Sequence, residues 1–316
     1  MRKNKTGNFK FKHSLGQNFI TDEFLLEDIT DESGITKEDF VLEIGPGNGA
    51  LTRCLCDRAK HVVIVEIDKS LIPLLKSNLK DYNNVSIINA DFLNYDFKNI
   101  IDEFLSVAHT ARDYDTIGAM HREPIKPDSI LPIKVVANLP YYITSPIINN
   151  LLQNPYISEM TLMVQKEVAE RIVAVPSTKD FGILTLACNY FADTEMIMIV
   201  SKECFFPKPK VDSAVVHFKK HPEFVYSDKC ENSNCDNNNR MGELCKPLSD
   251  NSYEKLFKLI KASFAQRRKK LSNSLTNAGY DKEVISAAFT KLNFDENVRA
   301  ENLSLEDYKN LLNLIL

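Results

Sequence analysis

Short apolar segments alternate with amphipathic segments of helical period between about residues 40 and 200. The expected strands are 40–44, 61–67, 85–90, 134–138, 160–165 and 196–201, with a later one at 214–218. The expected helices between them include 69–80, 145–153 and 181–191. Continuous apolar strands separated by helices are typical of a parallel sheet covered on both faces. The pattern therefore predicts a doubly wound α/β fold.

The chain changes character after about residue 222. Residues 223–250 are polar and rich in Asn and Ser, which indicates a linker or insertion. From residue 252 onward the apolar residues follow a helical period. We therefore expect an α/β domain over 1–222 and a small all-helical domain over 223–316. The irregular stretch at about 106–132 is expected to be an inserted surface loop.

Composition excludes several classes of protein. The longest apolar run is far shorter than the ~20 residues that span a membrane, and the basic start has no apolar segment of the secretory type. The seven cysteines form no paired C-x2-C units, so free thiols in a reducing compartment are expected and no metal site is predicted. We expect a cytoplasmic protein, and nothing in the sequence requires more than a monomer.

The net charge of −4 conceals an uneven distribution. Residues 1–21 carry five Lys or Arg and no acid, residues 202–220 carry five against two, and residues 254–280 carry seven against one. The remainder of the chain is therefore strongly acidic. Basic segments that adjoin candidate motifs on an acidic body indicate a polyanionic partner. Scattered solvated lysines would explain any one segment, but explain three less well.

Polar or glycine-rich groups follow the first three expected strands. Gly45 and Gly47 lie in the turn after the first strand, where the absence of a side chain lets the backbone approach a nucleotide-like ligand. Glu66 ends the second strand, where a carboxylate would accept hydrogen bonds from ribose hydroxyls. Both features also fit a dinucleotide site. Asp91, followed by Phe92, ends the third strand and would bind an adenine amino group, or would simply cap a helix.

The fourth strand runs into Asn138, Leu139, Pro140 and Tyr141. The amide oxygen of Asn138 and a neighbouring backbone carbonyl can accept both hydrogens of an exocyclic NH2 group. Such acceptors draw the nitrogen toward pyramidal geometry and localise its lone pair for attack. Proline removes a backbone donor, and Tyr141 can stack on a base. A strand-end turn with a packed tyrosine is the alternative interpretation.

The motifs together resemble one enzyme family. They are LGQNF (15–19), VLEIGPGNGALT (41–52), VEID (65–68), NADFL (89–93), NLPYYITSPII (138–148), FFPKPKVDSAVV (205–216) and FAQRRKKLSNSL (264–275). This set is similar to the small-subunit ribosomal RNA adenine N6,N6-dimethyltransferases, the kasugamycin-sensitivity family. The resemblance implies a Rossmann-like class I methyltransferase sheet and S-adenosylmethionine as cofactor. It also implies dimethylation of two adjacent adenines near the 3′ end of small-subunit rRNA during ribosome biogenesis.

The resemblance also implies roles for matching positions. The cofactor-binding set would be Asn18, Ile20, Gly45, Gly47, Glu66, Asp91 and Asn138. The catalytic turn would be Asn138, Leu139, Pro140 and Tyr141, with direct SN2 transfer of the methyl group and no general base. Tyr141 and Phe205 would sandwich the target base, although Phe205 also fits a core position. Arg267, Arg268 and Lys269, expected on a basic helix, would contact RNA phosphates or lie on a solvated face.

Three rival functions deserve comparison. The sister family that methylates an adenine of large-subunit rRNA would share Asn138 and Tyr141, but LGQNF, KVDS and FAQRRKKLSNSL favour the small subunit. A nicotinamide-dependent dehydrogenase would leave the NLPY turn and the basic segment unexplained. A non-catalytic RNA-binding assembly factor is disfavoured by the intact glycines and by Glu66, Asp91 and Asn138.

Overall fold

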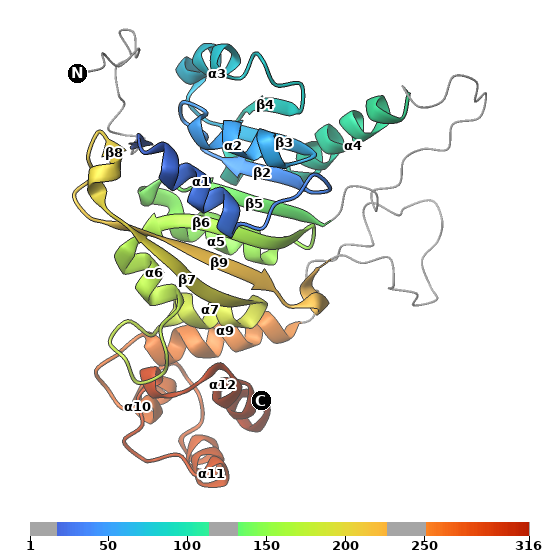
Figure 1. Ribbon diagram of the computed structural model, residues 1–316. Helices are drawn as coiled ribbons and strands as arrows, with labels where there is room; N and C mark the ends of the chain where they lie inside the picture. The colour runs from blue at the N-terminus through green and yellow to red at the C-terminus, as the bar shows by residue number, and fades with distance from the viewer. Residues whose placement is uncertain (1–17, 114–131, 226–250, 316) are drawn as a thin grey trace. The chain divides into compact units, whose positions relative to one another are not determined.

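The computed structural model describes residues 18–113, 132–225 and 251–315 (Figure 1). The basic arm, most of the expected inserted loop and the polar linker lie outside the described residues. The chain divides into two compact units, one of which comprises Met1–Ile148, Glu159–Lys166 and Ile197–His217. The second comprises Asn149–Ser158, Glu167–Met196 and Phe218–Leu316.

A seven-stranded sheet carries all seven strands expected from the sequence. Its strands are β2 (Phe40–Ile44), β3 (His61–Glu66), β4 (Val85–Asn89), β5 (Ile133–Asn138), β6 (Ile157–Gln165), β7 (Ala192–Val200) and β9 (Ser213–Lys220). Their order is β4-β3-β2-β5-β6-β9-β7. Strand β2 pairs in parallel with β3 and β5, and β3 pairs in parallel with β4. The α/β fold is confirmed.

Strand β9 departs from the expected parallel arrangement. The Lys166 amide, just after β6, donates to the carbonyl of Asp212, while Thr161 bonds to His217. Residue numbers therefore rise along β6 as they fall along β9, which is the signature of an antiparallel pair. The expectation of a wholly parallel sheet was wrong here, because a short connection from β7 returns the chain between β6 and β7.

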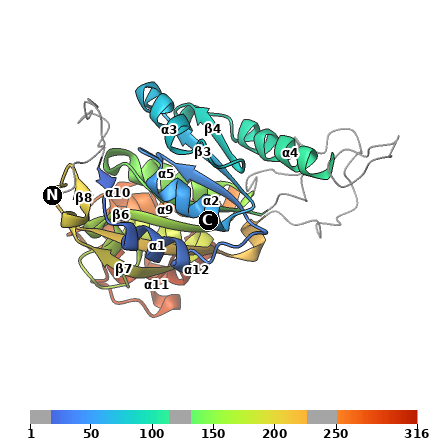
Figure 2. The same ribbon diagram turned by 45° about the horizontal axis from the view of Figure 1, so that its top comes forward.

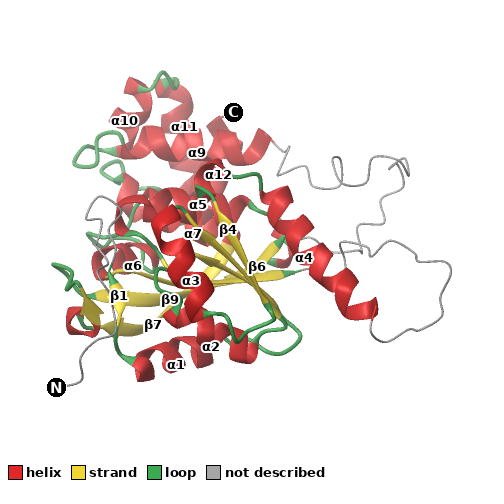
Figure 3. Cartoon of the chain, turned by 90° about the horizontal axis from the view of Figure 1, so that it is seen from above, coloured by secondary structure: helices red, strands yellow, loops and turns green. Residues whose placement is uncertain are grey.

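Helices cover both faces of the sheet in the first unit. Alternate residues of β2 point to opposite faces, so Phe40 meets Phe104 of α4 (Phe97–Asp113) at a ring distance of 5.4 Å. Val41 instead packs in a core cluster with Leu55 of α2 (Ala50–Arg58). Helices α1 (Glu23–Glu32) and α2 lie side by side in Figure 3. Because α4 reaches Asp113, the first part of the expected surface loop is helical.

The remaining short elements of this unit connect the strands. They are η2 (Lys69–Leu71), α3 (Ile72–Asn78), η3 (Phe92–Asn94), η5 (Tyr141–Ile143), η6 (Lys202–Cys204) and the first half of α5 (Thr144–Gln153). Strand β4 forms one edge of the sheet, and α3 lies beside it in both ribbon views (Figures 1 and 2).

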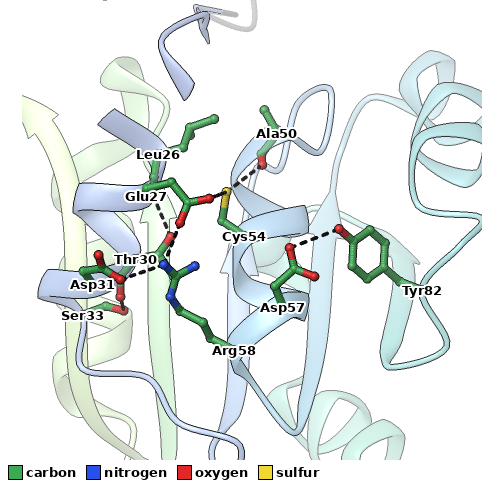
Figure 4. A network of polar contacts seen from close by, with 10 residues as sticks. All are labelled: Leu26, Glu27, Thr30, Asp31, Ser33, Ala50, Cys54, Asp57, Arg58 and Tyr82. Atoms are coloured by element: carbon green, nitrogen blue, oxygen red, sulfur yellow. Dashed lines mark hydrogen bonds and ion pairs between the residues drawn. The ribbon is translucent and has the colours of Figure 1, made fainter. Parts of the chain in front are cut away.

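An ionic network joins α1 to α2 on the surface (Figure 4). The guanidinium of Arg58 donates to the carboxylates of Glu27 at 2.6 Å and Asp31 at 2.7 Å. These carboxylates are half exposed or more, so solvent weakens each pair to below about 1 kcal/mol. The helices are held chiefly by their shared apolar cluster, which includes Leu26 and Leu55.

A second, two-stranded sheet has no counterpart among the expected elements. Strand β1 (Phe19–Ile20) pairs antiparallel with β8 (Phe205–Phe206), placing Phe19 opposite Phe206 and Ile20 opposite Phe205. Strands of two residues leave no periodic signal in a sequence. This pair holds the segment that contains Asn18 and Ile20 beside the end of the main sheet.

The second unit is mainly helical. Its helices are α6 (Lys166–Ile172), α7 (Ile183–Phe191), α9 (Asn251–Phe264), α10 (Leu271–Asn277), α11 (Lys282–Leu292) and α12 (Leu305–Ile315), with short turns η7 (Pro222–Phe224) and η8 (Ala300–Asn302). One core cluster contains residues of α7 and of α9 to α12. Its centre is Tyr308, which is fully buried and donates to the Ala300 carbonyl at 2.9 Å. Among the described residues, no helix has the length and apolarity that crossing a membrane requires.

Candidate functional site: a cavity at the strand ends

An open cavity lies in the first unit, at the carboxyl ends of the parallel strands, and its volume of about 950 Å³ includes the solvent at its open mouth. Ten residues expected at the site line it: Asn18, Ile20, Gly45, Gly47, Glu66, Asp91, Asn138, Leu139, Pro140 and Tyr141. Eight of them lie at or just after the ends of β2, β3, β4 and β5, which are neighbours in the sheet, at the edge where open α/β sheets bind their ligands. Asn18 and Ile20 come from the β1 segment instead. Which of them contacts which ligand stays a prediction.

The glycine turn has a backbone that only glycine adopts without strain. Gly45 and Gly47 have φ angles of +69° and +61°. A Cβ atom on Gly47 would also lie 2.7 Å from the Phe19 ring, which lines the cavity. Two requirements therefore coincide at Gly47: a left-handed backbone and space for a neighbouring ring.

Glu66 is fixed by backbone amides at the end of β3. One carboxylate oxygen accepts from the amide of Asp68 at 2.8 Å, and the other accepts from the amide of Gly47 at 3.3 Å. Burial raises the pKa of Glu66, while these amides oppose the rise. The carboxylate thus links the glycine turn to β3 and still faces the cavity, where its remaining lone pairs can accept from ligand hydroxyls.

Asp91 performs the capping role that was its alternative interpretation. Its carboxylate accepts from the amide of Leu93 at 3.1 Å and from the side-chain amide of Asn94 at 2.7 Å. It nevertheless lines the cavity together with Phe92, which follows it and is buried. The cap fixes the orientation of the carboxylate, so capping and ligand binding are compatible at this position.

The turn after β5 presents two acceptors. The side-chain nitrogen of Asn138 donates to the Asn18 carbonyl at 3.3 Å, which fixes the amide and leaves its oxygen to accept. The Leu139 amide donates to the Met163 carbonyl of β6. The carbonyl of Pro140 already accepts from Ile143 and Thr144. The Leu139 carbonyl accepts from none of the described residues, so it is the backbone acceptor that the turn leaves beside Asn138.

Two adjacent tyrosines line the cavity differently. The hydroxyl of Tyr141 is hydrogen-bonded to that of Ser213 at 2.6 Å, and burial raises its pKa. Tyr142 is 52% exposed, and its pKa is raised by partial burial and by the charges of Asp91 and Glu66. Tyr141 is therefore anchored at its hydroxyl, while Tyr142 stands at the rim near the two carboxylates.

Sequence reasoning did not single out several lining residues of the cavity, and two of them bear directly on the site. Glu43, in β2, is 2% exposed and accepts from the Thr52 hydroxyl at 2.6 Å. Burial raises its pKa to about 8, with a smaller contribution from the charge of Glu66, so it is largely protonated at neutral pH. Phe19 is the other. A single acid within an apolar strand was the available signal for Glu43, whereas the position of Phe19 depends on the β1–β8 pair.

Phe205 does not line this cavity. Its side chain is 4% exposed and packs in the core cluster of the first unit, with Ile20 opposite it in the β1–β8 pair. The structure thus places it at the core position that was its alternative interpretation. The next residue, Phe206, is 55% exposed. A role for Phe205 beside the target base stays a prediction.

The basic segment of the second unit is a turn rather than the expected helix. Helix α9 ends at Phe264 and α10 begins at Leu271, so residues 265–270 connect them. The Arg267 guanidinium donates to the carbonyls of Lys179 and Phe181 and pairs with Glu301 at 3.1 Å. These bonds fix Arg267 to its own unit. Arg268 and Lys269 are exposed.

The described cysteines Cys54, Cys56, Cys188 and Cys204 are free thiols. Burial raises the pKa of Cys54 to about 11 and that of Cys56 to about 12, so both stay protonated. Within the described ranges, no three His, Cys, Asp or Glu residues are grouped to hold a metal ion.

Comparison with known proteins gives consistent matches. Residues 8–233 match the family model for ribosomal RNA adenine dimethylase. Ribosomal RNA small subunit methyltransferase A of Clostridium acetobutylicum is 39% identical over 96% of this chain and 93% of its own length. The protein of the same name from Caldanaerobacter subterraneus subsp. tengcongensis is 41% identical over 97% of each.

Two solved structures share the fold. A dimethyladenosine transferase from Plasmodium falciparum has a TM-score of 0.65 at 22% identity, covering 93% of this chain and 95% of its own. The 23S rRNA methyltransferase ErmE has a TM-score of 0.61 at 24% identity, covering 94% and 99%. At these identities the likeness establishes the class I methyltransferase architecture alone.

Proposed function

Because this chain belongs to the ribosomal RNA adenine dimethylase family, we propose that it dimethylates N6 of two adjacent adenines near the 3′ end of small-subunit rRNA. The single observation that carries the proposal is the turn after β5. There the oxygen of Asn138 and the carbonyl of Leu139 are left as acceptors beside an anchored tyrosine. An exocyclic amine has two hydrogens, and this pair can accept both.

The chemistry of the site rests on position rather than on a side-chain base. Adenine N6 is a weak nucleophile because its lone pair is delocalised into the ring, and two acceptors favour the pyramidal form. Tyr141 would stack on the base, a contact worth roughly 1–3 kcal/mol. Asn138 and Leu139 would stabilise the positive charge that develops on nitrogen. The phenol of Tyr141, protonated and bonded to Ser213, is not available as a base.

The opposite part of the cavity fits S-adenosylmethionine, which supplies a methyl group on a sulfonium ion. The turn at Gly47 has no room for a Cβ atom, Glu66 can accept from ribose hydroxyls, and Asp91 can accept from an adenine amino group. Asn18 and Ile20 would close the site from the side of β1.

The small subunit is preferred to the large one as substrate. Relatives at 39–41% identity over nearly the whole chain are named as small-subunit enzymes, whereas the 23S rRNA enzyme is 24% identical. We further propose a cytoplasmic monomer that acts in ribosome biogenesis, with Arg268 and Lys269 contacting RNA phosphates.

Methyl transfer tests the proposal directly. Labelled S-adenosylmethionine is incubated with small subunits that lack these methyl groups, with large subunits as control, and the nucleosides are then analysed. We expect dimethyladenosine from small subunits only, and a loss of at least about 100-fold in Asn138→Ala. Asn150→Ala, an exposed asparagine of α5, is the matched control and should retain activity.

Other outcomes discriminate between the rivals. Label on large subunits would assign the chain to the resistance-type function. Tight cofactor binding without transfer to either subunit would indicate a binding protein that retains its cavity. Full activity in Asn138→Ala would refute the role of the turn.

A further inference from the structure

The KVDS segment, residues 210–213, ends in the residue that anchors Tyr141. Its last residue, Ser213, is fully buried at the start of β9 and is hydrogen-bonded to the hydroxyl of Tyr141 at 2.6 Å. We propose that Ser213 is a positioning residue that holds the Tyr141 ring in the orientation required to stack on the target adenine. The inference rests on the proposed function, since it specifies how the same site orders its base-binding ring.

The start of β9 is held from two sides, which makes it a rigid support. The Asp212 carbonyl accepts from the Lys166 amide at the end of β6, at 3.0 Å. The Asp212 carboxylate accepts from the Lys202 amide just after β7, also at 3.0 Å. The next residue is Ser213, so its hydroxyl is carried by a backbone tied to both neighbouring strands. The antiparallel insertion of β9 thus brings a fixed hydroxyl to the tyrosine.

Within the described part of the chain, the other hydrogen bonds of this turn involve its backbone. The Thr144 hydroxyl donates to the carbonyl of Pro140 at 3.0 Å and approaches that of Tyr141 at 3.4 Å. These contacts fix the main chain of the turn and leave rotation about the side-chain bonds. Ser213 supplies the distal anchor that limits this rotation, and a ring fixed at both ends can stack on a base without first being ordered.

A purely structural role for the Ser213 hydroxyl predicts a different pattern of effects. Loss of a buried hydrogen bond lowers stability wherever it occurs. A positioning role lowers the rate constant for methyl transfer while leaving cofactor affinity unchanged, because Ser213 does not line the cavity. It also makes the effects of Ser213 and Tyr141 substitutions interdependent.

The experiment is a double-mutant cycle with Ser213→Ala and Tyr141→Phe, measured as kcat on small subunits and as Kd for S-adenosylhomocysteine. Each single variant should lose about 10-fold in kcat, and the double variant should lose about 10-fold rather than about 100-fold. Cofactor Kd should not change, and Ser213→Thr, which keeps a hydroxyl, should recover most of the rate. Ser263→Ala is the matched control, since Ser263 is a buried serine outside the cavity whose hydroxyl donates to the Leu259 carbonyl at 2.8 Å.

A second readout does not depend on activity. The hydrogen bond from Ser213 lowers the pKa of Tyr141 against the larger effect of burial, so Ser213→Ala should raise that pKa further. The phenolate absorbance of Tyr141 is isolated by subtracting the titration of Tyr141→Phe from that of the parent protein. If Ser213→Ala shifted the Tyr141 titration but the parent protein transferred no methyl groups, the proposed function would be rejected and the Ser213–Tyr141 contact would stand. Wild-type kcat in a folded Ser213→Ala protein, or multiplicative losses in the cycle, would overturn the positioning role.

Discussion

At the scale of single residues, two carboxyl groups of the cavity have a pKa that burial raises. They belong to Glu43 and Glu66, which lie on neighbouring strands. Their local bonds differ: Thr52 donates a hydroxyl to Glu43, whereas Glu66 accepts two backbone amides. Amide donors favour the charged form of Glu66. The two acids are therefore expected to differ in protonation, with Glu43 the more neutral.

The raised pKa of Glu43 predicts a specific dependence of stability on pH. The folded protein keeps a proton on Glu43 up to about pH 8, whereas the unfolded chain releases it near the ordinary value of 4.5. The folded state thus binds more protons between these values, and the free energy of unfolding falls as pH rises. Glu43→Gln should remove this share of the slope, which is at most about 1.4 kcal/mol per pH unit for one proton.

Urea denaturation at pH 5, 6, 7 and 8 measures the difference in stability between the parent protein and Glu43→Gln. Their urea midpoints should diverge as pH rises, because the variant becomes more stable relative to the parent protein. Glu66 remains in both proteins, so its contribution cancels to first order. Parallel pH profiles for the two proteins would show that Glu43 is ionised in the folded state.

At the residue level, the positions of side chains that follow directly from the end of a strand were accessible from the sequence, while their ligand contacts stay predictions. Asn138, Glu66 and Asp91 all line the cavity because parallel strands deliver their carboxyl ends to one edge. Glu43 was missed because nothing local distinguishes a cavity-facing acid from a buried structural one. The burial of Phe205 depends on its pairing opposite Ile20. Its position therefore does not follow from the end of a strand of the main sheet.

At the scale of elements, the two adjacent arginines of the α9–α10 connection are expected to act differently: Arg267 stabilises the second unit, and Arg268 binds RNA. Arg267 is held by two carbonyls and Glu301, all within the second unit. We expect Arg267→Met to lower the stability of this unit by about 1 kcal/mol, discounted because the side chain is 45% exposed. The double variant Arg268→Ala/Lys269→Ala should leave stability unchanged and weaken RNA binding instead.

Thermal unfolding and filter binding to small-subunit rRNA separate these effects. The double variant should reduce the slope of log K against log salt by about 1.4, which corresponds to two phosphate contacts on single-stranded RNA. Arg267→Met is the matched control, because it removes a positive charge from the same connection. If Arg267→Met lost more RNA affinity than the double variant and kept its stability, the expected difference in role between Arg267 and its neighbours would be wrong.

Elements with a strong period were predictable, and those defined by long-range pairing were not. Strands β2 to β5 coincide with the expected ones to within a residue at each end, since each is an apolar run bounded by polar turns. The direction of β9 was not accessible, because an apolar run has the same pattern in either direction. The β1–β8 pair joins residues far apart in sequence through two-residue strands. It left no pattern to detect.

At the scale of the whole molecule, the positive charges are concentrated in particular segments. The chain is acidic overall, with a net charge of −4, yet residues 202–220 and 254–280 are basic. The cavity itself carries Glu43, Glu66 and Asp91. In the proposed function, the basic segments bind the polyanionic RNA, while the cavity with Glu66 and Asp91 receives the cofactor and one neutral base. The energetics of RNA binding and of cofactor binding are therefore expected to be separate.

Salt dependence should reveal that separation. Binding of small-subunit rRNA releases counterions from neutralised phosphates, so we expect its affinity to fall by about 10³-fold between 50 and 200 mM salt. In the proposed site, S-adenosylhomocysteine would be held by hydrogen bonds and would neutralise no phosphates, so its Kd should change less than about 2-fold over the same range. Both are measured on the full chain, by filter binding and by calorimetry. An RNA affinity that is insensitive to salt would mean that base contacts rather than the basic segments hold the substrate, and the charge asymmetry would then lack the role assigned to it.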